Sequence, residues 1–132
     1  MSREAPCGAE EARTRSRVAR MYINLAEVAS ATREPEARNA AAGNAVLAAI
    51  AASDALCCRR LGRRSREQDH SLAATLLAKI TPDGAKLARD LTSVLAVKDT
   101  AHYGTTFLTE AKLRAALRSA TRLVEAAESA LP

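Results

Sequence analysis

The chain has few aromatic residues: one Phe, two Tyr and no Trp among 132 residues. Strands favour aromatic and β-branched side chains, so this scarcity argues against a β-rich fold. It argues equally against a platform that stacks single-stranded bases on aromatic rings. The core must be built from Leu, Ile, Val and many Ala, and Ala is the best helix former. The composition therefore predicts an all-α fold.

Cysteine and histidine are also scarce. The three cysteines (Cys7, Cys57 and Cys58) and two histidines show no zinc-ligand spacing, so we expect neither a metal nor a cofactor. An odd cysteine count without a CxxC pair predicts reduced thiols and a cytoplasmic protein. The sequence contains no P-loop, dinucleotide glycine fingerprint or nucleophile elbow. We also see no apolar run long enough to span a membrane and no signal-peptide core, so we expect no membrane partner.

Apolar residues recur at helical spacing along most of the chain, which predicts an antiparallel up-and-down bundle of about five helices. The expected helices cover about residues 11–32, 35–61, 69–80, 82–103 and 110–130, in one domain over residues 11–132. Residues 1–10 contain Pro and Gly without apolar periodicity, and we expect a disordered tail there. The first helix is expected to face the core with Val18, Met21, Tyr22, Leu25, Val28 and Ala29.

Several residues predict where helices begin and end. Pro35 suits the first turn of the second helix, and Gly62 suits the left-handed position that follows a helix. Thr109 is a good N-cap for the last helix. The second helix is apolar nearly all round from Ala40 to Leu56, which predicts that it is central and buried.

Positive charge is the main surplus. The net charge is +5, and sixteen of the twenty basic residues are Arg, whose planar donors suit phosphates and carboxylates. Five arginines fall within eight residues at the end of the second helix, just before His70 and a predicted helix N-terminus. This cluster predicts a phosphate or nucleic-acid site; the alternative is a solvated helix end. The cluster consists of Arg59, Arg60, Arg63, Arg64 and Arg66.

A second group lies near the end of the fourth expected helix. Lys98 and His102 are four residues apart and share one helical face, so His102 could transfer protons while Lys98 stabilises negative charge. Alternatively, His102 only complements the helix dipole. Asp99 could orient either group, and Tyr103 could contact a base.

Two further carboxylates are candidates for structural or orienting roles. Asp54 lies in the apolar second helix, where a carboxylate needs a partner, and it could pin this helix to the arginine turn or orient a histidine. Asp69 is expected to cap the third helix and to pair with the arginines.

Two stretches resemble a known family, HEPN domains (higher eukaryotes and prokaryotes nucleotide-binding), in particular their small stand-alone bacterial members. The resemblance covers about residues 40–128. One stretch resembles the junction of the second and third HEPN helices: Leu61-Gly62, polar residues ending at Gln68, Asp69-His70-Ser71-Leu72 and Leu76-Leu77. The other resembles their second signature: Lys98-x-x-Ala101-His102-Tyr103.

The resemblance implies a helical bundle that forms a homodimer, with a partner protein of antitoxin or nucleotidyltransferase type. In active members, paired motifs cut RNA without metal, using the RNA 2′-hydroxyl as nucleophile and a histidine for proton transfer. Here Lys98 replaces the motif arginine, and its spacing to His102 is shorter than the motif requires. This departure favours a binding module over an enzyme.

We therefore expect an HEPN-like module that binds a phosphate-containing ligand or nucleic acid, RNA first, through the arginine-rich turn. Two alternatives stay open. One is a metal-independent, toxin-type endoribonuclease that uses His102 and Lys98. The other is a non-catalytic interaction or scaffold subunit.

Overall fold

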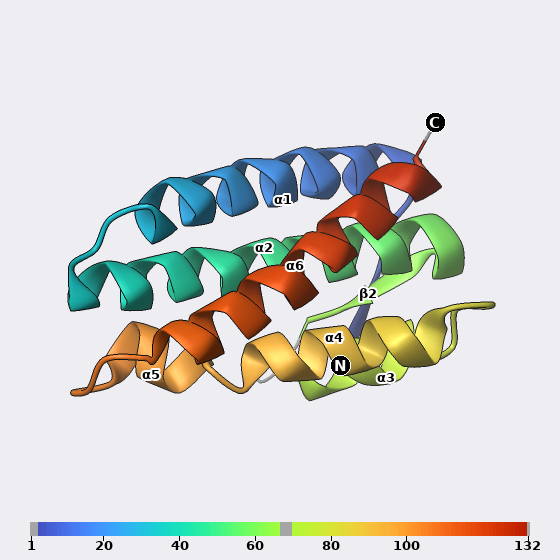
Figure 1. Cartoon of the computed structure of the whole chain (residues 1–132). Helices are drawn as coiled ribbons and strands as arrows, with labels where there is room; N and C mark the ends of the chain where they lie inside the picture. Colours follow the sequence, from blue (N-terminus) through green and yellow to red (C-terminus); the bar gives the residue numbers. More distant parts are fainter. Residues whose placement is uncertain (1–2, 67–69, 132) are drawn as a thin grey trace.

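The structure is a computed structural model that describes residues 3–66 and 70–131. It confirms the all-α bundle, with a two-stranded ladder as the only sheet in the described part of the chain. Figure 1 shows α1 and α2 side by side, with α6 crossing them obliquely. Helices α3, α4 and α5 lie on the side of α2 that is away from α1. The elements are β1 (Glu4–Pro6), α1 (Ala9–Ser30), α2 (Pro35–Leu61), β2 (Arg63–Ser65), α3 (Ser71–Leu77), α4 (Gly84–Leu95), α5 (Lys98–Tyr103) and α6 (Glu110–Ala130).

Helix α2 is the central element, as its composition predicts. It contacts α1, α3, α4, α5 and α6, and most of its residues from Ala41 to Cys58 are buried. Alanines supply most of this surface and let the neighbouring helices approach closely. By length and hydropathy, Pro35–Leu61 could also cross a membrane, which corrects the expectation of no such run, but its most apolar window is 78% buried in the bundle. Gly62 ends the helix in the expected left-handed conformation (φ 73°).

Helix α1 has its expected bounds within two residues, but its expected core face is only partly right: Val18, Tyr22 and Ala29 pack against the core, and the other three residues do not. The buried residues are small or lie elsewhere: Ala12, Ser16, Ala19, Ile23 and Ala26. Met21, Leu25 and Val28 face outward instead. The reason is that α1 approaches α2 and α6 through alanines, which only small side chains allow at short range.

The fourth expected helix is divided into two. Helix α4 ends at Leu95, and α5 begins at Lys98 after the buried Val97. The break lets α5 turn toward α2, where His102 lies over Gly43. The side chain of Asn39 then holds the following loop: it donates to the carbonyl oxygens of Thr100 and Thr106 and accepts from the Leu108 amide.

The N-terminal segment differs most from the expected disordered tail. Strand β1 pairs antiparallel with β2, in the register Glu4–Ser65, Ala5–Arg64 and Pro6–Arg63. A disulfide then joins Cys7 to Cys58. The expectation of three reduced thiols is therefore wrong, because α1 and α2 form a hairpin whose open end brings these two distant cysteines together.

Candidate functional site

The predicted arginine cluster lies at one end of the bundle, where α2 ends and β2 begins. We call Arg59, Arg60, Arg63, Arg64 and Arg66 the arginine end. Arg59, Arg60 and Arg66 are exposed, whereas Arg63 and Arg64 are half-buried. The three exposed guanidinium groups form no ion pair with any carboxylate in the described part of the chain. They are therefore available to an anion from solvent.

The arginine end is held in place by the N-terminal segment. The Cys7 amide donates to the Gly62 carbonyl at 3.0 Å, and the Arg66 amide donates to the Arg3 carbonyl at 2.8 Å. The Arg63 guanidinium lies 2.8 Å from the Glu4 carboxylate. Arg63 and Arg64 therefore lie on a strand, where the sequence predicted a polar turn, while Arg59 and Arg60 lie in the last turn of α2 and Arg66 follows the strand.

Asp54 connects the arginine end to α1. Its carboxylate accepts a hydrogen bond from Arg15 at 3.1 Å, and only 14% of its side chain is exposed. Burial raises the pKa of Asp54, while the positive charges of Arg15, Arg64 and His70 oppose that shift. This contact supports a structural role for Asp54, but the partner is Arg15 of α1 and not the arginine turn that the sequence predicted.

An open cavity of about 660 Å³ lies beside this ion pair. Its lining carries both signs of charge: Glu10, Glu11 and Asp54 are acidic, and Arg15 and Arg64 are basic. An anion is repelled by the three carboxylates, so this cavity is a weaker anion site than the exposed guanidinium groups nearby.

Cys57 faces the interior next to this region. Burial, together with the nearby charge of Asp54, raises the pKa of its thiol to about 12. A thiol that stays protonated at neutral pH is a poor nucleophile. Cys57 therefore serves the core rather than chemistry.

His70 precedes α3 with a left-handed backbone (φ 61°), which is uncommon for a residue with a side chain. His70 is close enough to Asp54 to interact with it electrostatically, so His70 lies near the arginine end as expected. Asp69, the expected cap and arginine partner, lies outside the described residues. Helix α3 has seven residues, which is too short for its N-terminus to add much to the positive potential.

Lys98, Asp99, His102 and Tyr103 lie together on α5. The Nε2 atom of His102 is 3.4 Å from the Gly43 carbonyl oxygen, and the Tyr103 ring meets the His102 ring edge-on at 5.9 Å. His102 and Tyr103 are nonetheless exposed. Nothing in the described residues forms a cluster of three or more metal-ligating side chains.

Within one chain, the arginine end and the candidate residues of α5 lie far apart. His102 contacts Gly43, which precedes Arg59 by sixteen residues of α2. At 1.5 Å per residue, this distance is about 24 Å. The 98–103 stretch and the arginine cluster therefore do not form one site within one copy of the chain.

Sequence reasoning missed three contacts that connect the elements. Arg15 binds Asp54, Arg122 binds the buried Asp90 through several hydrogen bonds of 2.7–3.2 Å, and Cys7 is bonded to Cys58. The signal for the third was the hairpin itself. Because a short connection joins α1 to α2, residues equally far from it along the two helices must lie side by side.

No family model, no curated protein and no solved structure matches this chain. The HEPN resemblance therefore remains a prediction.

Proposed function

We propose that the protein binds a phosphate-containing ligand, RNA being the first candidate, through the arginine end. The observation that carries the proposal is the set of exposed guanidinium groups on a backbone anchored by β1 and the disulfide. A backbone that is already held in place loses less entropy when the arginines on it bind phosphate oxygens, and the planar guanidinium group suits those oxygens. The net charge of +5 favours the same kind of ligand.

RNA comes first among phosphate ligands because of the HEPN resemblance, which is part of this proposal. Arg59, Arg60 and Arg66 would bind the backbone phosphates. His70 and Tyr103 were also predicted to contact the ligand; His70 lies near the arginine end, whereas Tyr103 lies on α5 with His102.

The experiment is a titration of fluorescein-labelled RNA, followed by anisotropy at several salt concentrations. The double variant Arg59→Ala/Arg60→Ala should bind more weakly, and the slope of log K against log salt should fall by ~1.4, or ~0.7 for each lost phosphate contact. The matched control is Arg114→Ala/Arg118→Ala, which removes the same charge from exposed positions on α6. Equal losses in the two variants would show that only net charge matters and would refute a specific site.

The ribonuclease alternative is tested in the same samples. If the protein cuts RNA with His102, gel analysis in the presence of EDTA will show shortened products, and His102→Ala will abolish them. RNA that stays intact with both proteins leaves binding as the activity. If the wild type neither binds nor cuts RNA, the interaction-subunit alternative gains support.

The cellular location bears on access to RNA. The cytoplasmic prediction rested on the cysteine count, and the Cys7–Cys58 bond removes that reason, because such bonds persist mainly in oxidising compartments. Acid quenching of cells followed by thiol alkylation tests the location. Alkylated Cys7 and Cys58 would indicate a reducing compartment, and protected cysteines an oxidising one.

A further inference from the structure

The Cys7–Cys58 disulfide fastens a short strand to the arginine end. Strand β1 has three residues and packs mainly on β2, the other strand of the ladder. A two-stranded ladder is at best marginally stable in water. Helices α1 and α2, by contrast, pack side by side along their lengths (Figure 1). Loss of the disulfide would therefore free β1 while the helices remain packed.

Strand β1 supplies order to the arginine end rather than charge. Its ladder holds β2 in place, and the Arg66 amide donates to the Arg3 carbonyl at 2.8 Å. The described part of this segment carries one basic and one acidic side chain, Arg3 and Glu4, whose charges cancel. Release of β1 would thus leave the net charge of the arginine end nearly unchanged, but it would remove the ladder that holds the backbone of residues 63–66.

The two cysteines of the disulfide differ in their access to solvent. Cys7 is half-buried, whereas Cys58 is only 2% exposed. A thiolate from solvent therefore attacks the sulfur of Cys7. The new bond joins the incoming sulfur to Cys7 as the Cys7–Cys58 bond breaks, and Cys58 leaves as a thiolate that takes a proton from water. A second thiolate attacks the incoming sulfur and displaces Cys7, so the two thiols are oxidised to a disulfide and supply the two electrons.

The third cysteine does not interfere with this exchange. Cys57 is buried, and burial together with the nearby charge of Asp54 raises the pKa of its thiol to about 12. Since only a thiolate attacks a disulfide, Cys57 does not compete for the sulfur of its neighbour Cys58. The bond between Cys7 and Cys58 can therefore open and form again without exchange of partners.

We propose that thiol–disulfide exchange with a low-molecular-weight thiol at Cys7 switches the affinity of the arginine end for phosphate. The oxidised protein binds RNA on a backbone that is already held in place, and reduction releases β1 and weakens binding. This inference rests on the proposed function, because it regulates the same site. Ordering even one backbone residue on binding weakens affinity about tenfold, so a loss of at least about this size is expected.

The first experiment repeats the labelled-RNA titration with oxidised and with reduced protein. Reduction of the wild type with a dithiol should weaken binding about tenfold or more. Cys7→Ser should bind as weakly as the reduced wild type and should not respond to the dithiol. The matched control is Cys57→Ala, which keeps the cross-link and should respond as the wild type does. Circular dichroism checks that every sample is folded.

The outcomes of the titration separate the switch from the proposed function. Measurable and equal affinities of the oxidised and reduced wild type would refute the switch and leave RNA binding standing. Tighter binding after reduction would show that Glu4 masks Arg63, with which it forms an ion pair, and would refute the switch as well. Absence of RNA binding in both states would overturn the proposed function, and the switch with it.

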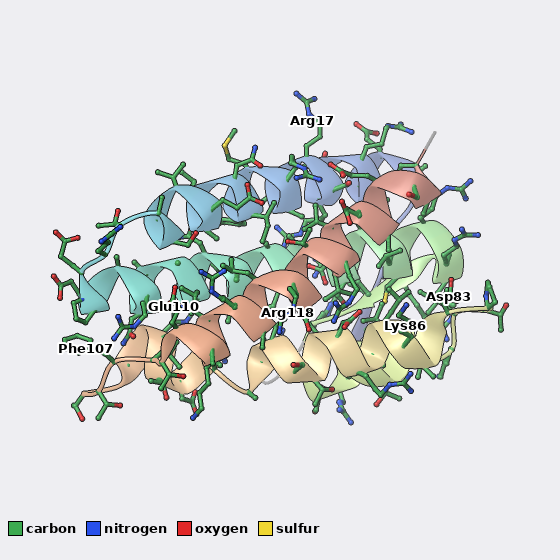
Figure 2. All side chains as sticks on the ribbon, in the orientation of Figure 1. Arg17, Asp83, Lys86, Phe107, Glu110 and Arg118 are labelled. Atoms are coloured by element: carbon green, nitrogen blue, oxygen red, sulfur yellow. A yellow bond between two sulfur atoms is a disulfide. The ribbon has the colours of Figure 1, made fainter. Side chains whose placement is uncertain are left out.

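Hydrogen exchange measures the release of β1 without RNA. On reduction, the Cys7 and Arg66 amides, which donate to backbone carbonyls across the ladder, should exchange faster. The start of α6 is the internal control, because Phe107 and Glu110 lie at the opposite end of the bundle in Figure 2, and amides there should keep their protection. Unchanged exchange at Cys7 and Arg66 would show that β1 stays paired, and faster exchange in both regions would show general unfolding; either result overturns the proposal.

Reduced glutathione tests which sulfur the thiol attacks. Oxidised protein is incubated with glutathione, quenched with acid during partial reduction, digested and analysed by mass spectrometry. The mixed disulfide should be found on the peptide that contains Cys7. Glutathione on the peptide that contains Cys58 instead would overturn Cys7 as the site of exchange.

Discussion

Removal of the Cys7–Cys58 cross-link is expected to destabilise the protein by about 4 kcal/mol. The bond closes a loop with a sequence separation of 51 residues, and the chain-entropy model assigns about 4 kcal/mol to a loop of this length. Cys7→Ser is the suitable change because Cys7 is half-buried, whereas a serine at the buried Cys58 would add a separate cost.

Urea unfolding followed by far-ultraviolet circular dichroism measures the effect. With a slope of about 1–3 kcal/mol per molar urea, the midpoint should fall by at least about 1.3 M. Wild-type protein treated with a dithiol reductant should unfold at the same midpoint as Cys7→Ser, and the reductant should not affect Cys7→Ser itself. The control Cys57→Ala keeps the cross-link and should stay sensitive to reductant. A wild type with the same midpoint with and without reductant would refute the reasoning.

Two further predictions concern titration and close packing. Burial raises the pKa of Asp54, so the stability advantage of wild type over Asp54→Asn should fall as pH rises from about 4. The Arg20 hydrogen bond lowers the pKa of Glu128, so the stability advantage of wild type over Glu128→Gln should be present above about pH 4 and lost below it. Urea unfolding at several pH values measures both advantages. Plotted against pH, the two advantages should have slopes of opposite sign, and slopes of the same sign would contradict both assignments. Gly84→Ala should cost about 1–3 kcal/mol, because its β-carbon would meet the Leu77 carbonyl oxygen. In Gly8→Ala the new β-carbon meets no atom closer than 3.8 Å, and only the N-cap preference for glycine over alanine is lost. This variant should therefore lower the thermal midpoint less, and equal midpoints for the two variants would rule out the clash.

The bounds of α2 and the start of α6 were predictable because local chemistry sets them. Pro35 at the start of α2, Gly62 after its end and Thr109 before α6 act through their own backbone and side chains. The Thr109 hydroxyl accepts from the Lys112 amide at 3.2 Å, as an N-cap should. Such signals need no knowledge of the rest of the chain.

The orientation of α1 was not predictable from hydrophobicity alone. A periodicity argument gives weight to Met21, Leu25 and Val28 and little to alanine. Close helix packing reverses that weight, since only small residues such as Ala19 and Ala26 fit between the helices. A stripe of alanines opposite a stripe of large apolar residues was the available signal.

The candidate site was predictable in part for a related reason. The arginines of the 59–66 stretch are adjacent in sequence, so their grouping needs no tertiary information. The anchoring of that stretch by β1 and Cys7 joins residues 51 or more positions apart. These contacts depend on how the α1–α2 hairpin closes, which no local pattern specifies.

The closed hairpin has a topological consequence. The α1–α2 connection and the disulfide together make residues 7–58 a covalent ring from which the rest of the chain continues. A protease that cuts the exposed connection at Arg33 opens this ring without releasing a fragment. The nicked protein would run as one species on a denaturing gel without reductant and as two with it. Peptides from both sides of the cut would also remain linked in a mass spectrum.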